Sequence, residues 1–528
     1  MLSTLDISII LGSLLVVVIV GLLASRRKAT TANDYFLASG RLPWWIIGAA
    51  FVSTSVSSEQ IVGTIGGAYT HGMGIANWEW WSLPPYAVLI GVFIPVYLKN
   101  RITTVPELLS RRFSPVCGAV YSYVMLAAYV LVFMVPVVYG GALTFSELTG
   151  VQFHLVLWGM MLLVALYTVK GGLISVMWTD AVQCVMLLGG GILLYFVALR
   201  HIPGGWPAMV QANPERFHLY HPANDPLAPF AGLIAGTLGL FIFYQATNQV
   251  MVQRVLGARS VWDGIMGIIF AGFINFFRPL VTCFLGFIVF YWIHEMKQAP
   301  ALDKQDLTFP FALKTFAPAW GLRGIILAGF LAAVMSTVSA LANSTATIFS
   351  LDVYKKHINT DADDRRMVLV GRITSLLALV IAALIAPVLS SSNIFQYFQK
   401  GVTYLATPFV PVMVLGLLWK RTSKEGALAG LLGGILIQAA VVALDYYLEL
   451  KLHWLYLGFI AEVWVFVVVI GVSLATPPPP RECWEPFLWR PGVLWSVTED
   501  PTRPWYKSLR LWFAVYAITF ICLYWRFW

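Results

Sequence analysis

The chain has 528 residues, of which 59% are apolar and 11% are charged, with a formal net charge of +9. A soluble domain usually carries about 25% charged residues, so this composition excludes a soluble enzyme, a disulfide-rich secreted module and a disordered chain. The basic excess does not indicate nucleic-acid binding, because it is confined to short clusters between apolar segments. We expect a membrane protein solvated by the lipid bilayer.

Apolar runs, each near the ~20 residues needed to cross ~30 Å of hydrocarbon, recur along the whole chain. They are continuous rather than alternating, which argues against a β-barrel. The pattern predicts an all-α polytopic membrane protein with about fourteen transmembrane helices. We place them near residues 5–25, 43–71, 77–98, 117–145, 154–170, 176–199, 229–253, 262–293, 320–350, 367–390, 393–419, 425–446, 454–475 and 509–527.

The distribution of basic residues predicts the orientation. No positive charge precedes the first apolar run, whereas Arg26, Arg27 and Lys28 follow it. Alternate loops repeat this bias, so we expect a multi-pass plasma-membrane protein with both termini outside. Residues 476–508, which begin with a threonine and four prolines, predict a stiff cytoplasmic linker to a final helix at 509–528.

Two polar runs interrupt the apolar pattern, at 48–60 and 335–345. Hydroxyl side chains can bond their own backbone and locally unwind a helix, and membranes tolerate interrupted helices only where they line a cavity or site. The alternative is that small and hydroxyl residues merely allow close helix packing. Two such runs together favour a broken-helix site.

Short stretches carry a further, recognisable pattern: Ser57–Gln60, Asn77–Trp80, Gly171–Asp180, Asn248–Arg254, Asn343–Phe349, Phe398–Gln399 and Gly416–Arg421. In this order they resemble the solute:sodium symporter family, most closely its sodium/glucose cotransporter branch. The resemblance implies an inverted repeat of two five-helix units with a broken first helix in each, as in amino-acid/sodium symporters. It assigns residues 1–475 to a symporter core, with a leading helix at 5–25, repeats at 43–199 and 229–419, and two further helices at 425–475.

The same resemblance implies a sodium site. Na⁺ prefers hard oxygen ligands, which unwound helices supply as free carbonyls. The family's ligands map onto the backbone carbonyls of Ser53, Val56 and Ala333 and onto the hydroxyls of Ser336 and Thr337. Ordinary hydroxyl-to-backbone bonding is the alternative use of these residues.

A second sodium site is weaker in this sequence. Two-sodium members build it from an aspartate, here Asp180, and from hydroxyls one turn along the second broken helix. Ser339 supplies one hydroxyl, but Ala340 stands where a serine would complete the cage. We therefore expect one sodium per substrate, with Asp180 as a way-station for the ion.

The substrate site is implied by the sugar-transporting members. Equivalents of Gln60, Glu79 and Gln399 contact sugar hydroxyls there, an equivalent of Tyr244 stacks on the ring, and Ser82 and Asn248 are expected neighbours. Around this core the sequence departs from the family. Asn275 stands where the family has a sugar-contacting lysine, and Ser55 stands where it has an asparagine. Two further sugar-contacting asparagines are replaced by Phe133 and Phe241, and the tryptophan beside the stacking tyrosine is replaced by Gln245. These features predict sodium-coupled symport of a neutral monosaccharide or related polyol by alternating access.

Arg278 keeps an alternative open. It lies one helical turn beyond Asn275 and could bind the carboxylate of an acidic sugar, an amino acid or a monocarboxylate. Pairing with a structural carboxylate or a carbonyl end is the favoured interpretation. We expect no enzyme, since no nucleophile–base pair or metal cluster stands out, and a passive channel would not need a substrate-shaped set of carboxylate and amides.

Overall fold

The computed structural model describes the chain except for residues 1, 26–30, 226–228, 319, 390–393 and 499–502. The described residues form helices and connecting segments, with one isolated bridge between Leu42 and Ala258. The α-helices are α1 (Thr4–Ala24), α2 (Ala32–Leu37), α3 (Trp44–Ser55), α4 (Ser58–His71), α5 (Asn77–Trp80), α6 (Leu83–Val88), α7 (Ile94–Lys99), α8 (Val105–Arg112), α9 (Pro115–Ala128), α10 (Val135–Thr149), α11 (Phe153–Leu199), α12 (Gly205–Ala212), α13 (Phe230–Ile242), α14 (Gln249–Leu256), α15 (Val261–Asn275), α16 (Arg278–Thr282), α17 (Leu285–Phe290), α18 (Thr308–Phe316), α19 (Leu322–Ile348), α20 (Asp364–Ile385), α21 (Ile394–Leu418), α22 (Lys424–Tyr447), α23 (Trp454–Ala475), α24 (Arg481–Trp484), α25 (Pro491–Thr498) and α26 (Leu509–Phe527).

Shorter helical turns extend or connect these helices. The π-helical ones are η3 (Leu89–Phe93), η4 (Tyr129–Met134), η6 (Phe243–Thr247), η7 (Tyr291–Glu295) and η9 (Phe349–Ile358). The 3₁₀ turns are η1 (Ala38–Gly40), η2 (Gly72–Ala76), η5 (Pro214–Phe217), η8 (Gln305–Leu307), η10 (Ala386–Val388) and η11 (Trp505–Lys507). A π-turn widens a helix locally and is frequent at functional sites; η6 directly precedes an interruption of the helix that carries it.

The all-helical membrane class is confirmed, but the count of about fourteen spans is not. Among the described residues, 11 helical stretches are long and apolar enough to cross a membrane, or up to 12 if one bent pair counts as a span. One reason is that the predicted span 43–71 is divided, which leaves α3 only 12 residues long. Another is that two predicted spans, 154–170 and 176–199, fall within the single element α11.

α11 turns back on itself at Gly172, whose backbone angles (φ 59°, ψ −154°) are not helical. Tyr167 donates to the carbonyl of Met335 at 3.3 Å, and Asp180 accepts from Ser336 at 2.7 Å. Residues 167 and 180 would stand about 20 Å apart along a straight helix, yet both reach neighbouring residues of α19. The two halves of α11 therefore run antiparallel, side by side, and both contact α19.

The first polar run interrupts its helix as predicted. α3 ends at Ser55, Val56 and Ser57 are extended, and α4 begins at Ser58. Because Ser57 to Ser58 lie in the middle of the predicted span 43–71, the break falls at depth in the molecule, where these residues are buried.

The expectation of a break at 335–345 is wrong, because this run lies inside the continuous helix α19. Its hydroxyls bond carbonyls of their own helix: Thr337 donates to Ala333, Ser339 to Ser336 and Thr345 to Leu341. Hydroxyls satisfied in this way need no unwound backbone. The second interruption instead falls at Asn248, between η6 and α14, in the first helix of the second predicted repeat. The repeat boundaries stay a prediction.

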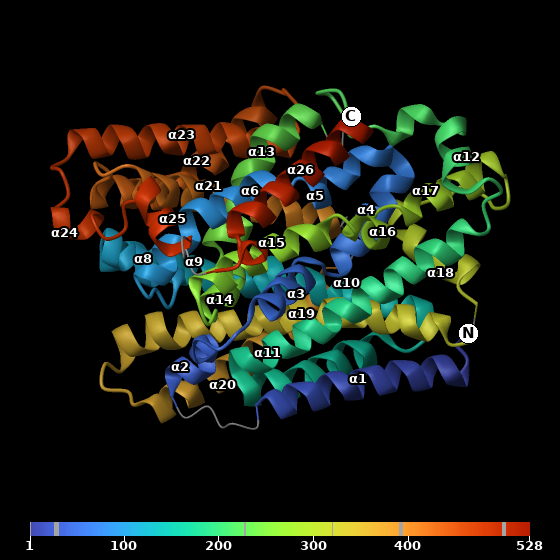
Figure 1. Cartoon of the computed structure of the whole chain (residues 1–528), viewed down its shortest axis with the longest axis horizontal. Coiled ribbons are helices and arrows are strands. Elements are labelled where there is room, and N and C mark those ends of the chain that lie inside the picture. Colours follow the sequence, from blue (N-terminus) through green and yellow to red (C-terminus); the bar gives the residue numbers. More distant parts are fainter. Residues whose placement is uncertain (1, 26–30, 226–228, 319, 390–393, 499–502) are drawn as a thin grey trace.

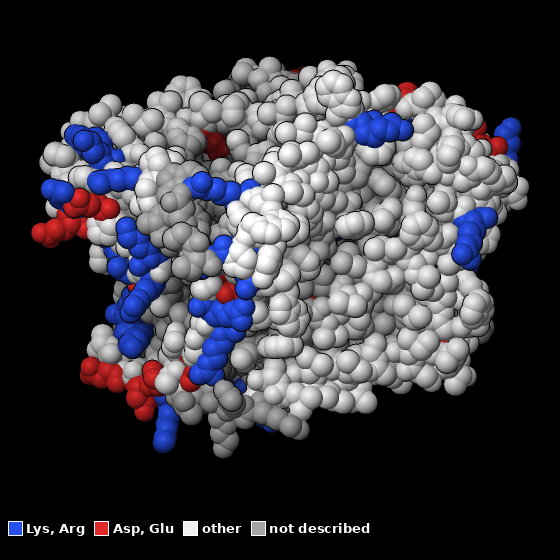
Figure 2. Space-filling view, in the orientation of Figure 1, with Lys and Arg blue, Asp and Glu red and all other residues white. Residues whose placement is uncertain are grey.

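Most helices run along the long axis of the molecule, and both termini lie toward the same end (Figure 1). Lys and Arg side chains gather at the opposite end, over the region of α8, α24 and α25 (Figure 2). The predicted linker lies at this basic end, where the backbone and indole nitrogens of Trp489 donate to the carbonyls of Leu417 and Gly91, at 2.8 and 2.6 Å.

Replacing Gly172 by Ala should destabilise the protein by about 1–3 kcal/mol, because these backbone angles are essentially restricted to glycine. An added Cβ would also lie 2.4 Å from the carbonyl oxygen of Tyr35. Thermal unfolding of the purified protein in detergent measures the change. Gly189→Ala in the same helix is the control, since nothing lies within 4 Å of its added Cβ; equal melting temperatures for the two variants would contradict the assignment of strain to Gly172.

Candidate functional site

The last four carbonyl groups of a helix receive no hydrogen bond from the regular helical pattern, and in α3 these are the carbonyls of residues 52–55. Each of them finds a donor. The Val52 carbonyl accepts from the Ser55 hydroxyl at 2.9 Å, and the Ser53 carbonyl accepts from the Val56 amide at 3.4 Å. The Thr54 carbonyl accepts from Thr337 on α19 at 3.1 Å, and the Ser55 carbonyl from Arg278 on α16 at 3.5 Å. The break is thus tied to two other helices.

Two of the candidate sodium ligands of α19, Thr337 and Ala333, lie against this break. Thr337 bridges the Thr54 carbonyl and the Ala333 carbonyl, at 3.1 and 3.2 Å, so the oxygens of α19 lie against the end of α3. The Ser53 hydroxyl is buried and has no hydrogen-bond partner among the described residues. Carbonyl and hydroxyl oxygens are the ligands that a hard cation prefers, so the residues present fit a sodium ion.

Asp180 lies beside this cluster in a buried network. One carboxylate oxygen accepts from Ser336 at 2.7 Å, and the other from Thr54 at 3.2 Å and from Arg254 at 3.0 Å. Asp180 and Arg254 are 0% and 1% exposed, so their ion pair is shielded from water. The Ser339 hydroxyl bonds the Ser336 carbonyl at 2.9 Å rather than Asp180.

A cavity adjoins the break, with a volume of about 500 Å³ that includes the space open to solvent. Four of the predicted substrate residues line it, namely Ser55, Gln60, Tyr244 and Gln399, and so does Arg278. The other lining residues are Glu59, Trp78, Leu240, Phe241, Gln245, Phe398 and Val402. Side chains from α3, α4, α5, α13, η6, α16 and α21 thus converge on one space.

Glu79 stands behind the cavity wall in an ion pair with Arg278. The carboxylate lies 2.6 Å from the guanidinium and accepts from the Gln60 amide at 2.8 Å. Arg278 also donates to Asn275 at 3.1 Å, and Asn275 donates to the Tyr86 hydroxyl at 3.0 Å. The favoured interpretation of Arg278, that it pairs with a carboxylate and a carbonyl end, matches its contacts.

Two other predicted neighbours of the substrate lie outside the cavity lining. The Ser82 hydroxyl bonds Tyr516 of α26 at 2.8 Å. Asn248 caps α14, where its side-chain oxygen accepts from the Val250 amide at 3.0 Å and from the Tyr129 hydroxyl at 2.7 Å.

The sequence analysis did not single out Glu59, Trp78, Phe398 or Val402 as substrate residues. Glu59 and Trp78 immediately precede Gln60 and Glu79, so the same motifs contained them. One oxygen of Glu59 bonds Ser57, and the other has no partner in the described part of the chain. The indole nitrogen of Trp78, the Nε of Arg278 and the amide oxygen of Gln245 are likewise unpartnered there. Residues that carry unpartnered donors and acceptors therefore line the cavity.

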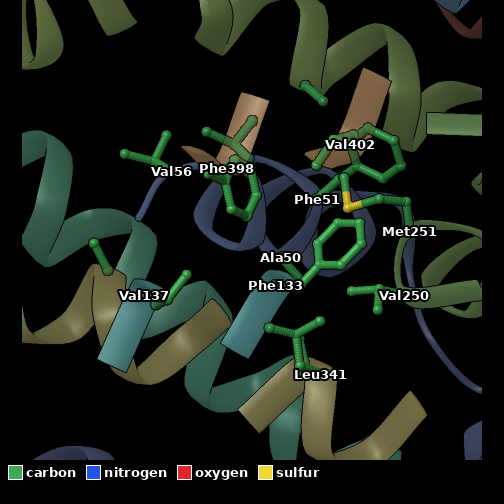
Figure 3. Close-up of a cluster of buried hydrophobic side chains, with 14 of the residues drawn as sticks. Ala50, Phe51, Val56, Phe133, Val137, Val250, Met251, Leu341, Phe398 and Val402 are labelled. Atoms are coloured by element: carbon green, nitrogen blue, oxygen red, sulfur yellow. The ribbon is translucent and has the colours of Figure 1, made fainter. Parts of the chain in front are cut away.

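A buried hydrophobic cluster continues from one side of the cavity (Figure 3). It begins at the lining residues Phe398 and Val402 and includes Val250 and Met251 of α14. Phe133 packs on the Phe398 ring at 5.5 Å and is stacked with the Tyr244 ring at 6.4 Å. This apolar layer borders the cavity at Phe398 and Val402 and extends to α14.

Interrupted membrane helices that meet beside a polar cavity are the architecture of secondary transporters. The model of the sodium:solute symporter family matches residues 35–434. The chain is 32% identical to a sodium/glucose cotransporter of Vibrio parahaemolyticus, over 90% of this chain and 91% of that protein. The chain belongs to the sodium:solute symporter family, and the resemblance read from the sequence is confirmed.

Further similarities agree with this assignment. A sodium/myo-inositol cotransporter 2 of Sus scrofa is 28% identical over 92% of this chain and 78% of that protein. The fold matches a Na⁺-coupled sialic acid symporter with a TM-score of 0.80 and 23% identity, over 90% of this chain and 99% of that one. The family assignment and the apolar helices together identify the chain as a multi-pass protein of the plasma membrane.

Arg278→Gln alone should destabilise the fold by about 3–5 kcal/mol, because it leaves the Glu79 carboxylate buried without its cation. Adding Glu79→Gln should restore much of the loss, since the charge is then gone as well. Thermal unfolding of both single variants and the double variant in detergent measures this coupling. If the losses of stability in the two single variants add up in the double variant, Glu79 and Arg278 have no stabilising interaction with each other.

Proposed function

We propose that this protein symports a neutral monosaccharide or related polyol with sodium by alternating access. The observation that carries the proposal is the cavity beside the α3 break, whose lining combines aromatic rings with polar residues that carry donors and acceptors unpartnered among the described residues. A polyhydroxylated solute satisfies both kinds of group, since each hydroxyl donates and accepts. The names of the relatives, sodium/glucose and sodium/myo-inositol cotransporters, support the same substrate class.

The ion pair of Glu79 and Arg278 favours a neutral substrate over an acidic one. Arg278 already faces a carboxylate at 2.6 Å, so its charge is balanced without a ligand. Glu59 adds a second carboxylate to the lining. An anionic sugar, amino acid or monocarboxylate would have to displace Glu79 and approach Glu59, and both steps cost electrostatic energy in a buried site.

Sodium binding at the break provides the coupling in this proposal. The ion is held by the carbonyls of Ser53, Val56 and Ala333 and by the hydroxyls of Ser336 and Thr337, and so fixes α3 against α19. The neighbouring residues Ser55 to Gln60 then reach their places in the cavity wall. One sodium ion crossing ~100 mV releases roughly 2.3 kcal/mol, and a tenfold gradient adds about 1.4 kcal/mol.

One sodium per substrate is the proposed stoichiometry. Asp180 is already paired with Arg254 at 3.0 Å, and the Ser339 hydroxyl is bonded to its own helix. A second ion would therefore have to replace these contacts. Asp180 remains next to Ser336 and suits a way-station for the departing ion.

The proposed orientation places both termini outside. Basic side chains concentrate at the end of the molecule opposite the termini (Figure 2), and cytoplasmic loops carry the excess of Lys and Arg in membrane proteins. The apolar cluster of Figure 3 borders the cavity at Phe398 and Val402, and Tyr244 is a cavity residue stacked against Phe133 of that cluster.

A sodium gradient should drive concentrative uptake of at least one hexose or polyol into proteoliposomes, because the ion and the solute bind adjacent parts of one interrupted helix. Uptake of a panel of radiolabelled neutral, amino and acidic sugars, with sodium or potassium outside, measures it. Simultaneous recording of charge movement should give a ratio near one per neutral substrate molecule. Equal uptake in both salts, without accumulation, would refute the proposal.

Thr337→Ala should raise the sodium concentration for half-maximal uptake about tenfold, which corresponds to about 1.4 kcal/mol, because one hard oxygen ligand is lost. Initial uptake rates at increasing sodium measure the shift. Thr345→Ala on the same helix is the matched control, since within the described part of the chain its hydroxyl bonds only the Leu341 carbonyl, at 2.7 Å. An unchanged sodium dependence in Thr337→Ala would place the ion elsewhere.

A further inference from the structure

The last helix, α26, reaches the turn that carries Glu79. The Tyr524 hydroxyl donates to the side-chain oxygen of Asn77 at 2.8 Å, and the Tyr516 hydroxyl bonds Ser82 at 2.8 Å. Asn77 and Ser82 bracket Glu79 in the sequence. These contacts join positions separated by 447 and 434 residues, and Tyr516 and Tyr524 are only 0% and 7% exposed.

Aromatic contacts extend the same attachment. Trp81 packs against Phe520 and Tyr524, with ring centroids 6.0 and 5.7 Å apart. Trp80 packs against Phe527 at 5.6 Å. The turn thus lies along one face of α26, over about three helical turns.

The turn needs such external support. α5 has only 4 residues, and the backbone leaves the helical region at Trp81 (φ −71°, ψ 48°) before α6 begins. α5 continues the 3₁₀ turn η2 (Gly72–Ala76), and a helical segment this short is at best marginally stable by its own hydrogen bonds, because nucleation is costly. Tertiary contacts must therefore hold its side chains in place.

The position of this turn decides the geometry of the substrate site. Glu79 meets Gln60 at 2.8 Å and Arg278 at 2.6 Å, and Trp78 lines the cavity. Hydrogen bonds weaken steeply when donor and acceptor move apart beyond their normal distances, so a displacement of about 1 Å would disconnect the Glu79 network.

We propose that Tyr516 and Tyr524 are positioning residues for the substrate site, through which the C-terminal helix sets the affinity for the sugar. The inference rests on the proposed function, because it takes the cavity at Glu79 to be where the sugar binds. The candidate sodium ligands lie on α3, on α19 and at the break, and the hydroxyls of the two tyrosines bond none of them. Loss of a tyrosine hydroxyl therefore reaches the sodium ligands only indirectly, through the Glu79 network, so at saturating sugar the sodium dependence should change much less than the affinity for the sugar.

Tyr516→Phe and Tyr524→Phe test the inference, since each removes one hydroxyl and keeps the ring. At saturating sodium, each variant should raise the half-saturating concentration of the transported sugar about three- to tenfold, the effect of one lost hydrogen bond. The maximal rate, and the half-saturating sodium at saturating sugar, should stay within about twofold of wild type, as expected when one positioned group is lost. Thr519→Val is the matched control on α26, because among the described residues its hydroxyl bonds only the Val515 carbonyl, at 2.8 Å.

A double-variant cycle adds a readout that general destabilisation would not produce. Ser82→Ala should raise half-saturation by the same factor as Tyr516→Phe, and the double variant should give no further rise. Unchanged half-saturation in the tyrosine variants, additive effects in the cycle, or reduced folded protein with normal half-saturation would each overturn the inference. Wild-type vesicles without sodium-driven sugar uptake would overturn the proposed function and this inference together, whereas normal wild-type uptake with unaffected variants overturns the inference alone.

Discussion

Backbone carbonyls inside a membrane need donors from the protein, and the end of α3 shows how this constraint organises the molecule. The interruption at Val56 and Ser57 frees carbonyls at a depth where water cannot satisfy them. Thr337 of α19 and Arg278 of α16 supply donors. The same contacts bring the oxygens of the candidate ion site and the wall of the cavity onto one short segment, so that ion and solute can influence each other without a long pathway.

The second consequence concerns buried charge. Arg278 beside the end of α3 also faces Glu79, and Arg254 faces Asp180. Each guanidinium is paired, because an isolated buried charge would be far too costly. One pair lies at the cavity and the other next to the candidate ion ligands. In each pair the positive charge of the arginine is therefore balanced by the negative charge of its carboxylate. Glu59 is an additional carboxylate in the cavity lining.

The sequence analysis succeeded where local chemistry decides the outcome. Apolar length identified membrane helices, and the hydroxyl-rich run around Ser55 indicated the first break. It failed at 335–345, because hydroxyls at helical spacing can bond their own helix as well as unwind it, and sequence does not distinguish these states. The second break at Asn248 lies in a shorter polar stretch, with Gln245 and Thr247 before it and Gln249 after it, which the sequence analysis did not interpret as a break. Its signal is the asparagine, whose side-chain oxygen caps the following helix.

By itself the sequence determined the membrane class and the family, because these follow from apolar length and from motifs read locally. Of the predicted substrate residues, four line the cavity, namely Ser55, Gln60, Tyr244 and Gln399. Only the tertiary structure decided which polar groups pair. The partner of Arg278 is 199 positions away in the chain, and the partners of Asn77 and Ser82 lie more than 430 residues away. Such pairings are set by how the helices pack against one another, and side-chain spacing along one helix carries no information about them.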